Sequence, residues 1–202
     1  MTRLSLICPT IGRTTLLVLS ETVIPELVYG VDEFIVVADG PIPEQAETLL
    51  KELATRHPGM VRFIQLETRV GDFGCTPCDV GIEAAKGDAV FFIGDDDRVV
   101  PGAFAAIRKA VDEFPNVPHL FSMQHQLGLL GNSLACCSVS SQQLVVPRDM
   151  SRMPKMSDVS KDDWPISDWV FIDKVHRAWD ATTMFHPEVI AILEAQHHGA
   201  FL

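Results

Sequence analysis

The sequence predicts an α/β fold in which a mostly parallel sheet carries helices on both faces. Through residue 114, short apolar stretches that suit buried strands alternate with stretches that suit helices, and this alternation is typical of a parallel sheet. The expected strands are apolar on both faces, as they are when helices cover both sides of a sheet. A chain of 202 residues is long enough for one such domain with a well-buried core. We therefore treat residues 1–202 as a single domain.

Strands and helices follow one another in regular order in the first half of the chain. Expected strands lie at 4–8, 32–40, 61–66 and 89–93, and expected helices at 14–28, 41–59, 76–86 and 101–114. Pro25 shortens or bends the first helix. The second helix is the clearest, because its apolar residues recur at the i, i+3, i+4, i+7 spacing. Pro101 is expected as the first residue of its helix, where a missing N–H costs nothing.

The pattern changes in the second half. Residues 119–126 and 133–140 flank a short apolar segment and are expected to form a β-hairpin or a pair of added strands. Residues 148–163 are polar and lack periodicity, which predicts a mobile loop. Two short helices are expected at 167–179 and 187–198.

Composition and charge exclude several classes of protein. Sixteen Lys and Arg residues against twenty-seven Asp and Glu residues give a net charge of −11, so we expect no nucleic-acid binding through a basic surface. No stretch suits a membrane span, and the first apolar run is too short for a signal peptide. Five scattered cysteines, an odd number, favour a reducing compartment. We expect a soluble cytoplasmic protein and leave homodimer formation open.

Three consecutive aspartates, Asp95, Asp96 and Asp97, directly follow a buried strand. Adjacent carboxylates repel one another unless a cation neutralises them, and all-oxygen ligation suits Mg²⁺ or Mn²⁺. The alternative is a solvated acidic turn before a helix, where Asp is favoured. Ligands of open α/β sheets bind beyond the carboxyl ends of the strands. Three segments end there with suitable side chains: "CPTIGR", "VVADG" and "FIGDDD".

The order of these segments resembles the GT-A glycosyltransferases of the family 2 type, most closely over residues 3 to 104. In that family the first strand ends in a Pro-Thr-x-x-Arg turn, the second in Asp-Gly, and a Gly-Ile-x-x-Ala-x-Gly-Asp helix precedes an Asp-x-Asp signature. The resemblance implies a GT-A, Rossmann-like fold with a nucleotide-sugar-binding half at 1–104 and an acceptor half at 105–202. The nucleotide-binding residues that it implies are Pro9, Thr10, Arg13, Asp39, Gly40, Asp95 and Asp96.

The resemblance also implies a reaction, transfer of a hexose from a nucleotide-diphosphate sugar to an acceptor hydroxyl with inversion. Asp95, Asp96 and Asp97 would hold Mn²⁺ or Mg²⁺, which stabilises the leaving diphosphate. Asp168, in "ISDWVF", matches the family's catalytic base. The alternative for Asp168 is a helix N-terminal residue favoured by the dipole. Asp162 and Asp163 are competing base candidates, and the sequence names neither sugar nor acceptor.

Two other functions remain open on the sequence. One is a non-catalytic GT-A-like module that binds nucleotide sugar without a base. The other is a sugar nucleotidyltransferase, which needs a Gly-rich N-terminal loop, whereas "CPTIGRTT" contains one glycine.

Further residues carry alternatives of their own. His176 and His186 are each either a third metal ligand or an ordinary histidine. The cysteines at 75, 78, 136 and 137 are expected to be ordinary thiols rather than a zinc site. Arg148, Arg152, Lys155 and Lys161 either close over a diphosphate as a lid or belong to a solvated loop.

Overall fold

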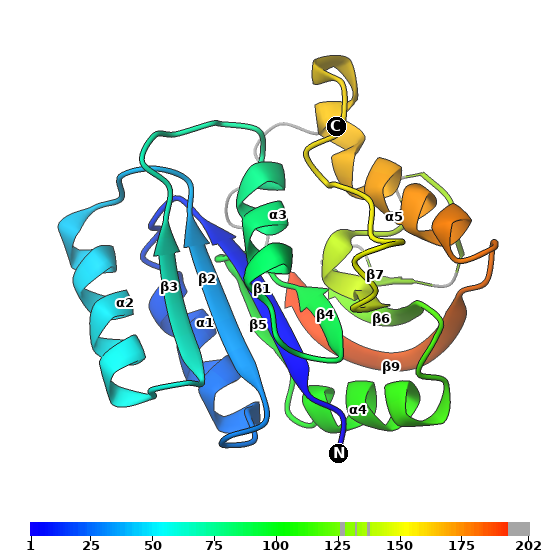
Figure 1. Ribbon diagram of the computed structural model, residues 1–202, viewed down its shortest axis with the longest axis horizontal. Coiled ribbons are helices and arrows are strands. Elements are labelled where there is room, and N and C mark those ends of the chain that lie inside the picture. Colours follow the sequence, from blue (N-terminus) through cyan, green and yellow to red (C-terminus); the bar gives the residue numbers. More distant parts are fainter. Residues whose placement is uncertain (126–127, 132, 137, 194–202) are drawn as a thin grey trace.

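The computed structural model describes residues 1–125, 128–131, 133–136 and 138–193. Within them lies a nine-stranded sheet in the order β3-β2-β1-β4-β8-β6-β9-β5, with β7 paired to β6. The strands are β1 (Leu4–Thr10), β2 (Glu33–Ala38), β3 (Val61–Gln65), β4 (Ala89–Phe92), β5 (Asp97–Val99), β6 (His119–His125), β7 (Gly128–Leu130), β8 (Leu144–Pro147) and β9 (Met184–Leu193). Figure 1 shows β1 near the middle of this sheet, between β2 and β4.

The first four strands form the parallel part of the sheet. β1 pairs in parallel with both β2 and β4, and β2 pairs in parallel with β3. The carboxyl ends of β1, β2 and β4 therefore meet at one edge, which is where the sequence analysis expects a ligand. Beyond β4 the sheet is mixed, because β8 is antiparallel to both β4 and β6 whereas β9 is parallel to β6.

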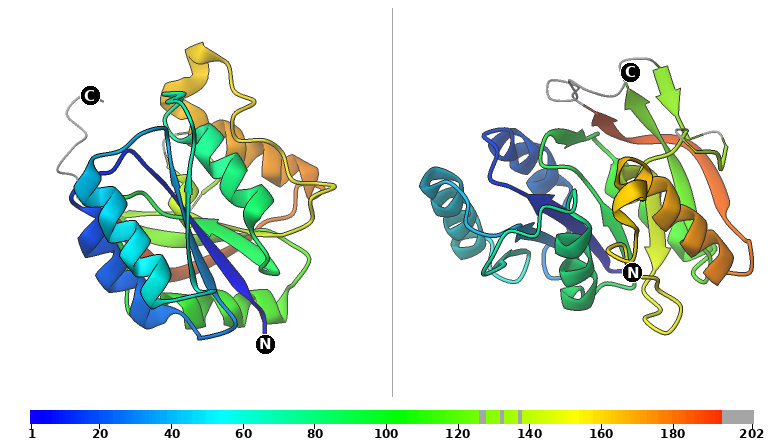
Figure 2. Two further views of the ribbon diagram at one scale, coloured as in Figure 1. Left: turned by 60° about the vertical axis from the view of Figure 1, so that its left-hand side comes forward. Right: turned by 90° about the horizontal axis from the view of Figure 1, so that it is seen from above.

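Helices cover both faces of the sheet, as predicted. One core cluster holds side chains of α1 (Leu16–Val23), α2 (Glu44–Arg56) and α4 (Ala103–Glu113). The other holds side chains of α3 (Cys75–Ala84) and α5 (Ser167–Ala178). Alternate residues of β1 and β2 enter the two clusters, because successive side chains of a strand point to opposite faces. Figure 2 shows these helices on the two sides of the sheet.

The N-terminal half follows the predicted order. The first helix ends as expected near Pro25, because η1 (Ile24–Glu26), a 3₁₀ turn, follows α1. The fourth helix begins later than expected. Gly102, at φ +84°, precedes its first residue Ala103, so Pro101 lies in the turn before the helix. The short strand β5 was not predicted, because it contains only three residues and two of them are charged.

The predicted helix at 187–198 is wrong for its described part. Residues up to 193 belong to β9, which lies between β6 and β5; residues 194–198 lie outside the described residues. Ile190 and Ala191 are buried in the sheet, and this tertiary pairing outweighs the helical spacing of the apolar residues. Pro187 falls where the β6–β9 register shifts, a position at which a strand tolerates proline.

The predicted hairpin is correct only for its first strand. Residues 119–125 form β6, but its hairpin partner β7 comes from the connecting segment, and the described residues of 133–140 form no strand. The next strand is β8, reached through η2 (Ser141–Gln143), another 3₁₀ turn. Leu134 and Val139 pack against the core without joining the sheet, so tertiary packing outweighs the strand-like composition of this segment.

Residues 148–160 of the predicted loop at 148–163 contain no helix or strand, and the last three residues begin η3 (Lys161–Ile166), a 3₁₀ helix. The loop is fastened to α3, because the carboxylate of Asp79 accepts the N–H groups of Met156 at 2.7 Å and Ser157 at 3.0 Å. Met156 is buried against the core. The absence of regular structure at 148–160 agrees with the prediction, and its mobility stays a prediction.

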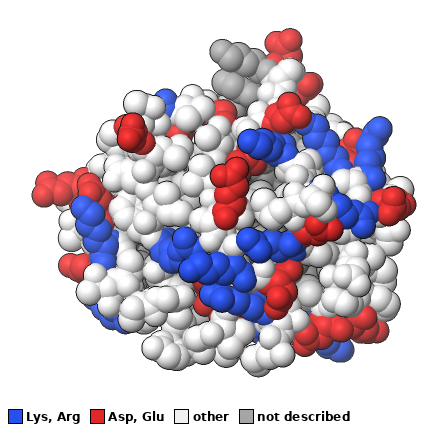
Figure 3. Space-filling view, in the orientation of Figure 1, with Lys and Arg blue, Asp and Glu red and all other residues white. Residues whose placement is uncertain are grey.

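Charged side chains on the surface are mixed in sign. Figure 3 shows Lys and Arg gathered in a short band across one face, with Asp and Glu beside them. Lys51 pairs with Glu47 on α2, and Arg177 pairs with Asp173 on α5 at 2.8 Å. Among the described residues, no helix is both long enough and apolar enough to cross a membrane.

Candidate active site

A cavity of about 560 Å³ opens at the carboxyl ends of β1, β2 and β4. Most of the predicted site residues line it: Pro9, Thr10, Arg13, Asp39, Asp95, Asp96 and Asp168. These residues come from four separate segments of the chain, which the parallel strands and α5 bring together. Two predicted residues, Gly40 and Asp97, lie outside the lining.

The first strand is tied to the aspartate cluster. Thr10, the last residue of β1, donates its hydroxyl hydrogen to Asp95 Oδ2 at 2.5 Å. The Arg13 guanidinium pairs with Asp95 Oδ1 and lies 3.5 Å from Asp96 Oδ2. Burial lowers the pKa of Arg13, but the neighbouring carboxylates, first that of Asp95, outweigh it and raise the pKa. One cation of the chain therefore already offsets part of the negative charge at this edge.

Asp97 does not line the cavity. Its Oδ2 accepts the N–H of Gly94 at 3.0 Å and an N–H of the Gln142 side chain at 3.2 Å. Its Oδ1 is buried and has no hydrogen-bond partner in the protein. Burial, followed by the charge of Asp96, raises the pKa of Asp97 to about 7. A bound cation would stabilise the ionised form of this buried carboxylate, which lacks a partner at Oδ1.

Asp39 fixes a loop over the cavity. Its carboxylate accepts the N–H groups of Val70 at 2.7 Å and Gly71 at 2.9 Å, and its carbonyl accepts Arg69 Nε–H at 3.3 Å. Gly40 follows at φ +79°, and a Cβ there would lie 2.5 Å from the backbone nitrogen of Arg69. Only glycine allows this close approach. Asp39 and Gly40 thus set the position of the 69–71 backbone.

Asp168 is in the first turn of α5 and faces the cavity. Ser140 donates its hydroxyl hydrogen to Asp168 Oδ2 at 2.7 Å. The helix is fixed on the sheet by Phe171, which is fully buried and packs edge-on against Phe92 of β4 with ring centroids 5.7 Å apart. The competing candidates Asp162 and Asp163 do not line the cavity, and the Asp163 carboxylate instead accepts the Ser160 hydroxyl at 2.7 Å.

Neither candidate histidine lines the cavity. His176 Nδ1 is 2.8 Å from Thr183 Oγ1, and His186 Nε2 is 2.9 Å from His119 Nδ1. The His186 ring is stacked on Phe121 with centroids 4.5 Å apart. These contacts correspond to the ordinary structural alternative for both residues.

Two of the cysteines and one of the basic loop residues have defined surroundings. Cys75 and Cys78 are buried free thiols of α3, and burial, followed by the charge of Asp72, raises the pKa of Cys75 to about 11. Cys136 is exposed, and Cys137 lies outside the described residues. Arg152 donates to the carbonyl of Ala178 and lies over the ring of Trp179, so it does not reach the cavity.

Several residues of the cavity were missed by the sequence analysis: Arg69, Phe73, Ser141, Gln142 and Met156. Phe73 is the most unusual of them, because it is 66% exposed and has a left-handed backbone at φ +58°. Such a conformation costs a bulky residue on the order of 1–3 kcal/mol and clusters at functional sites. The only sequence signal for it was a phenylalanine between two glycines, Gly71 and Gly74.

The aspartates fit a divalent cation that shares its ligands with a substrate. Among the described residues, no group of three or more His, Cys, Asp or Glu side chains is arranged to hold an ion, so Asp95, Asp96 and Asp97 do not form a complete shell. Mg²⁺ in particular binds through one or two carboxylates plus substrate phosphates. Asp95 and Asp96 line the cavity, and the adjacent Asp97 has a buried Oδ1 without a hydrogen-bond partner.

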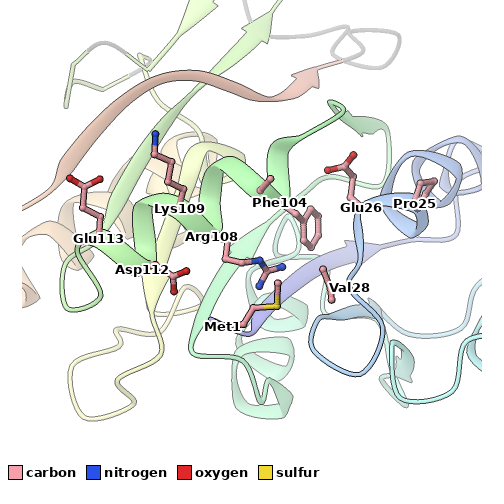
Figure 4. Close-up of a pocket in the computed structure, with 10 residues that line it drawn as sticks. Met1, Pro25, Glu26, Val28, Phe104, Arg108, Lys109, Asp112 and Glu113 are labelled. Carbon is pink, nitrogen blue, oxygen red and sulfur yellow. The ribbon is translucent and has the colours of Figure 1, made fainter.

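A second cavity, of about 730 Å³, lies away from these residues, between α4 and the segment around Pro25. Figure 4 shows Arg108 extending from α4 beside Met1. Arg108 is paired with the buried Asp32 at 2.7 Å, and both carboxylate oxygens of Glu26 lie 3.0 Å from the Gly102 nitrogen. None of the predicted site residues lines this cavity.

The fold and the position of the cavity define a class of protein, the GT-A glycosyltransferases. A parallel sheet with helices on both faces carries an acidic cluster at the carboxyl end of β4, and an aspartate of a later helix lines the same cavity. The model of "Glycosyl transferase family 2" matches residues 5–128, which is more than half of the chain. The chain belongs to glycosyl transferase family 2.

Solved structures agree with this fold. Residues 1–349 of S. aureus TarS in complex with UDP-GlcNAc align with a TM-score of 0.74 and 17% identity over 99% of this chain and 62% of that one. The mannosyltransferase PcManGT from Pyrobaculum calidifontis, in complex with GDP-Man and Mn²⁺, aligns with a TM-score of 0.72 and 15% identity over 98% of this chain and 58% of that one. The longer S. aureus TarS chain is covered to 37%. The present chain thus spans less than two thirds of these neighbours, and comparison with curated proteins gave no match.

Proposed function

We propose that the protein is a metal-dependent, inverting glycosyltransferase that moves a hexose from a nucleoside-diphosphate sugar to an acceptor hydroxyl. One observation carries the proposal: Asp39, the Asp95–Asp96 pair and Asp168 all line one cavity of about 560 Å³. That volume is within the range of small-ligand sites. The UDP-GlcNAc and the GDP-Man in the complexes of the two neighbouring structures belong to the same class of donor.

In this proposal each end of the cavity has its own role. The nucleobase lies beside Asp39, under the loop that carries Arg69 and Phe73, and Pro9, Thr10 and Arg13 line the same edge. Arg13 faces the diphosphate and offsets its charge. Asp95, Asp96 and Asp97 would hold Mn²⁺ or Mg²⁺, and a bound cation would stabilise the diphosphate leaving group.

Asp168 acts as the base at the other end. It takes the proton of the acceptor hydroxyl, the acceptor oxygen forms a bond to the anomeric carbon, and the bond from that carbon to the diphosphate oxygen breaks. The attack comes from the face opposite the leaving group, so the configuration inverts. Ser140, which donates to Asp168 at 2.7 Å, fixes one carboxylate oxygen and leaves the other for the acceptor.

Calorimetry with UDP and with GDP, with Mn²⁺ and with EDTA, tests the proposal together with an assay for diphosphate release from UDP-GlcNAc and GDP-Man. We expect Mn²⁺-dependent binding and slow release of diphosphate to water. Binding without release from any nucleotide sugar supports the alternative, a non-catalytic nucleotide-sugar-binding module. Tight diphosphate binding that is unchanged by EDTA contradicts the metal site.

A further inference from the structure

Ser140 and the η2 turn contact two aspartates: Asp168, which lines the cavity, and Asp97, which does not. Ser140 Oγ donates to Asp168 Oδ2 at 2.7 Å, and Gln142 Nε2 donates to Asp97 Oδ2 at 3.2 Å. The two carboxylates belong to α5 and β5, which are far apart in sequence and contact different parts of the sheet. Residues 140 to 142 thus contact both.

This short segment is held firmly by the residue that follows it. Gln143 is fully buried, its Oε1 accepts the Ser140 N–H at 2.8 Å, and its Nε2 donates to the Phe121 carbonyl at 3.0 Å. A Cβ at Gly131 would lie 2.5 Å from Gln143 Nε2, so glycine makes room for the side chain. The Ser140 backbone is therefore held by β6 through the Gln143 side chain.

The hydroxyl of Ser140 has one hydrogen and two acceptors. Besides Asp168 Oδ2 it contacts Gln142 Oε1. Because a hydroxyl donates once, the two acceptors compete for its hydrogen. An ionised Asp168 is the stronger acceptor. A hydroxyl that donates to Gln142 Oε1 polarises the amide and strengthens its N–H bond to Asp97.

We propose that Ser140 and Gln142 are positioning residues that couple Asp168 to Asp97 through one hydrogen-bonded chain. This inference rests on the proposed function, in which Asp168 is the catalytic base and Asp97 belongs to the cation site, so that the coupling would connect the base with the cation. The hydrogen-bonded chain transmits changes in the orientation and polarisation of its groups, and no proton crosses the Gln142 amide. By reciprocity, a change at either carboxylate changes the free energy of events at the other by the same amount.

A first experiment needs no substrate. Urea unfolding is measured for Asp168→Asn, Gln142→Ala and the double variant, both with Ser140 present and in the Ser140→Ala background. With Ser140 present we expect non-additivity of at least about threefold in the unfolding equilibrium constant, because the residues share one network. In the Ser140→Ala background we expect additivity. A matched control replaces Gln142→Ala by Gln124→Ala, an exposed glutamine whose side chain contacts only the neighbouring His125 carbonyl in the described bonds.

A second experiment addresses the site. Mn²⁺ affinity is measured by calorimetry in the presence of UDP. Asp168→Asn should change it at least about threefold with Ser140 present and by less than about 1.5-fold in Ser140→Ala. In the release assay, Ser140→Ala should lower kcat at least about tenfold with KM for the donor within about twofold, and Ser140→Thr, which keeps the hydroxyl, should restore most of kcat.

The outcomes separate the two proposals. Additive unfolding in both backgrounds overturns the coupling, whatever the activity. A wild-type protein that binds no nucleoside diphosphate contradicts the proposed function, while the unfolding cycle still decides whether the chain couples the two carboxylates. Equal effects of Asp168→Asn on Mn²⁺ affinity with and without Ser140 also overturn the coupling.

Discussion

The hydroxyl of Thr10 lies 2.5 Å from Asp95 Oδ2, although the two residues are 85 positions apart in the sequence. The contact joins the carboxyl ends of β1 and β4, and Arg13 adds an ion pair to the same carboxylate. The edge of the sheet is therefore organised before any ligand arrives, which reduces the ordering cost of binding.

Asp39→Asn should weaken UDP or GDP binding at least about fivefold. The carboxylate accepts two N–H groups, from Val70 and Gly71, whereas an amide side chain offers one oxygen and turns its NH₂ toward the second N–H. The loop that carries Arg69 and Phe73 then loses its position. Calorimetry measures the affinity, and a change of less than about twofold shows that the nucleobase lies elsewhere.

Phe73→Ala should lower nucleoside-diphosphate affinity about five- to twentyfold and leave inorganic pyrophosphate affinity unchanged. Stacking of a base on an aromatic ring contributes about 1–3 kcal/mol, and pyrophosphate has no base. Relief of the left-handed backbone is not expected from alanine, so Tm should change little. The control is Phe114→Ala, at the end of α4, which is also partly exposed. Equal loss for both ligands would indicate a general defect.

Asp97→Asn should stabilise the protein at pH 8 and not at pH 5. Burial, then the charge of Asp96, raises the pKa of Asp97 to about 7. The folded state therefore holds a proton between about pH 4 and 7 that the unfolded state has lost, so this carboxyl lowers stability as pH rises through that window. Asparagine removes the charge, and the gain at pH 8 should be on the order of 2 kcal/mol. Urea unfolding at both pH values measures it, and a loss at pH 8 contradicts it.

His119 should make the protein less stable in mild acid. It is fully buried, and because Nε2–H donates to the Phe114 carbonyl at 3.0 Å, Nδ1 accepts from His186. Burial lowers the pKa of His119 to about 4. As the pH falls from about 6.5 to 4, the unfolded state gains a proton that the folded state does not. The free energy of unfolding therefore decreases on acidification, by on the order of 2–3 kcal/mol.

The measurement for His119 is urea unfolding at pH 7.5 and 5 for the wild type and His119→Gln. Phe121 stacks on His186. Burial lowers the pKa of His186, and the charges of Glu188 and Glu113 raise it but do not outweigh burial. The variant should lose clearly less stability than the wild type on acidification. An equal loss in both proteins shows that other groups cause the acid sensitivity.

The sequence predicted the parts of the molecule that follow from local pattern. Strands at 4–8, 32–40 and 89–93 could be predicted from their apolar residues, and their candidate site residues could be grouped because parallel strands bring their carboxyl ends to one edge. β9 could not be predicted, because the spacing of its apolar residues suggests a helix. Its pairing with β6 and β5, which lie far from it in the sequence, decides its conformation. The residues that complete the cavity lie on turns, and the exposure of Phe73 and the reach of Gln142 depend on backbone angles that composition does not encode.

The most direct test of the proposed function is Asp168→Asn measured for affinity and for turnover on the same preparation. A base acts mainly in the transition state, so its loss lowers kcat and leaves donor binding nearly intact. Asparagine keeps the shape of the side chain and removes its charge and its basicity. We predict UDP or GDP affinity within about twofold of the wild type and diphosphate release from the nucleotide sugar lowered at least about a hundredfold, as general bases typically contribute. Release at the parental rate would show that the base lies elsewhere, and joint collapse of affinity and stability would show that Asp168 only stabilises the start of α5.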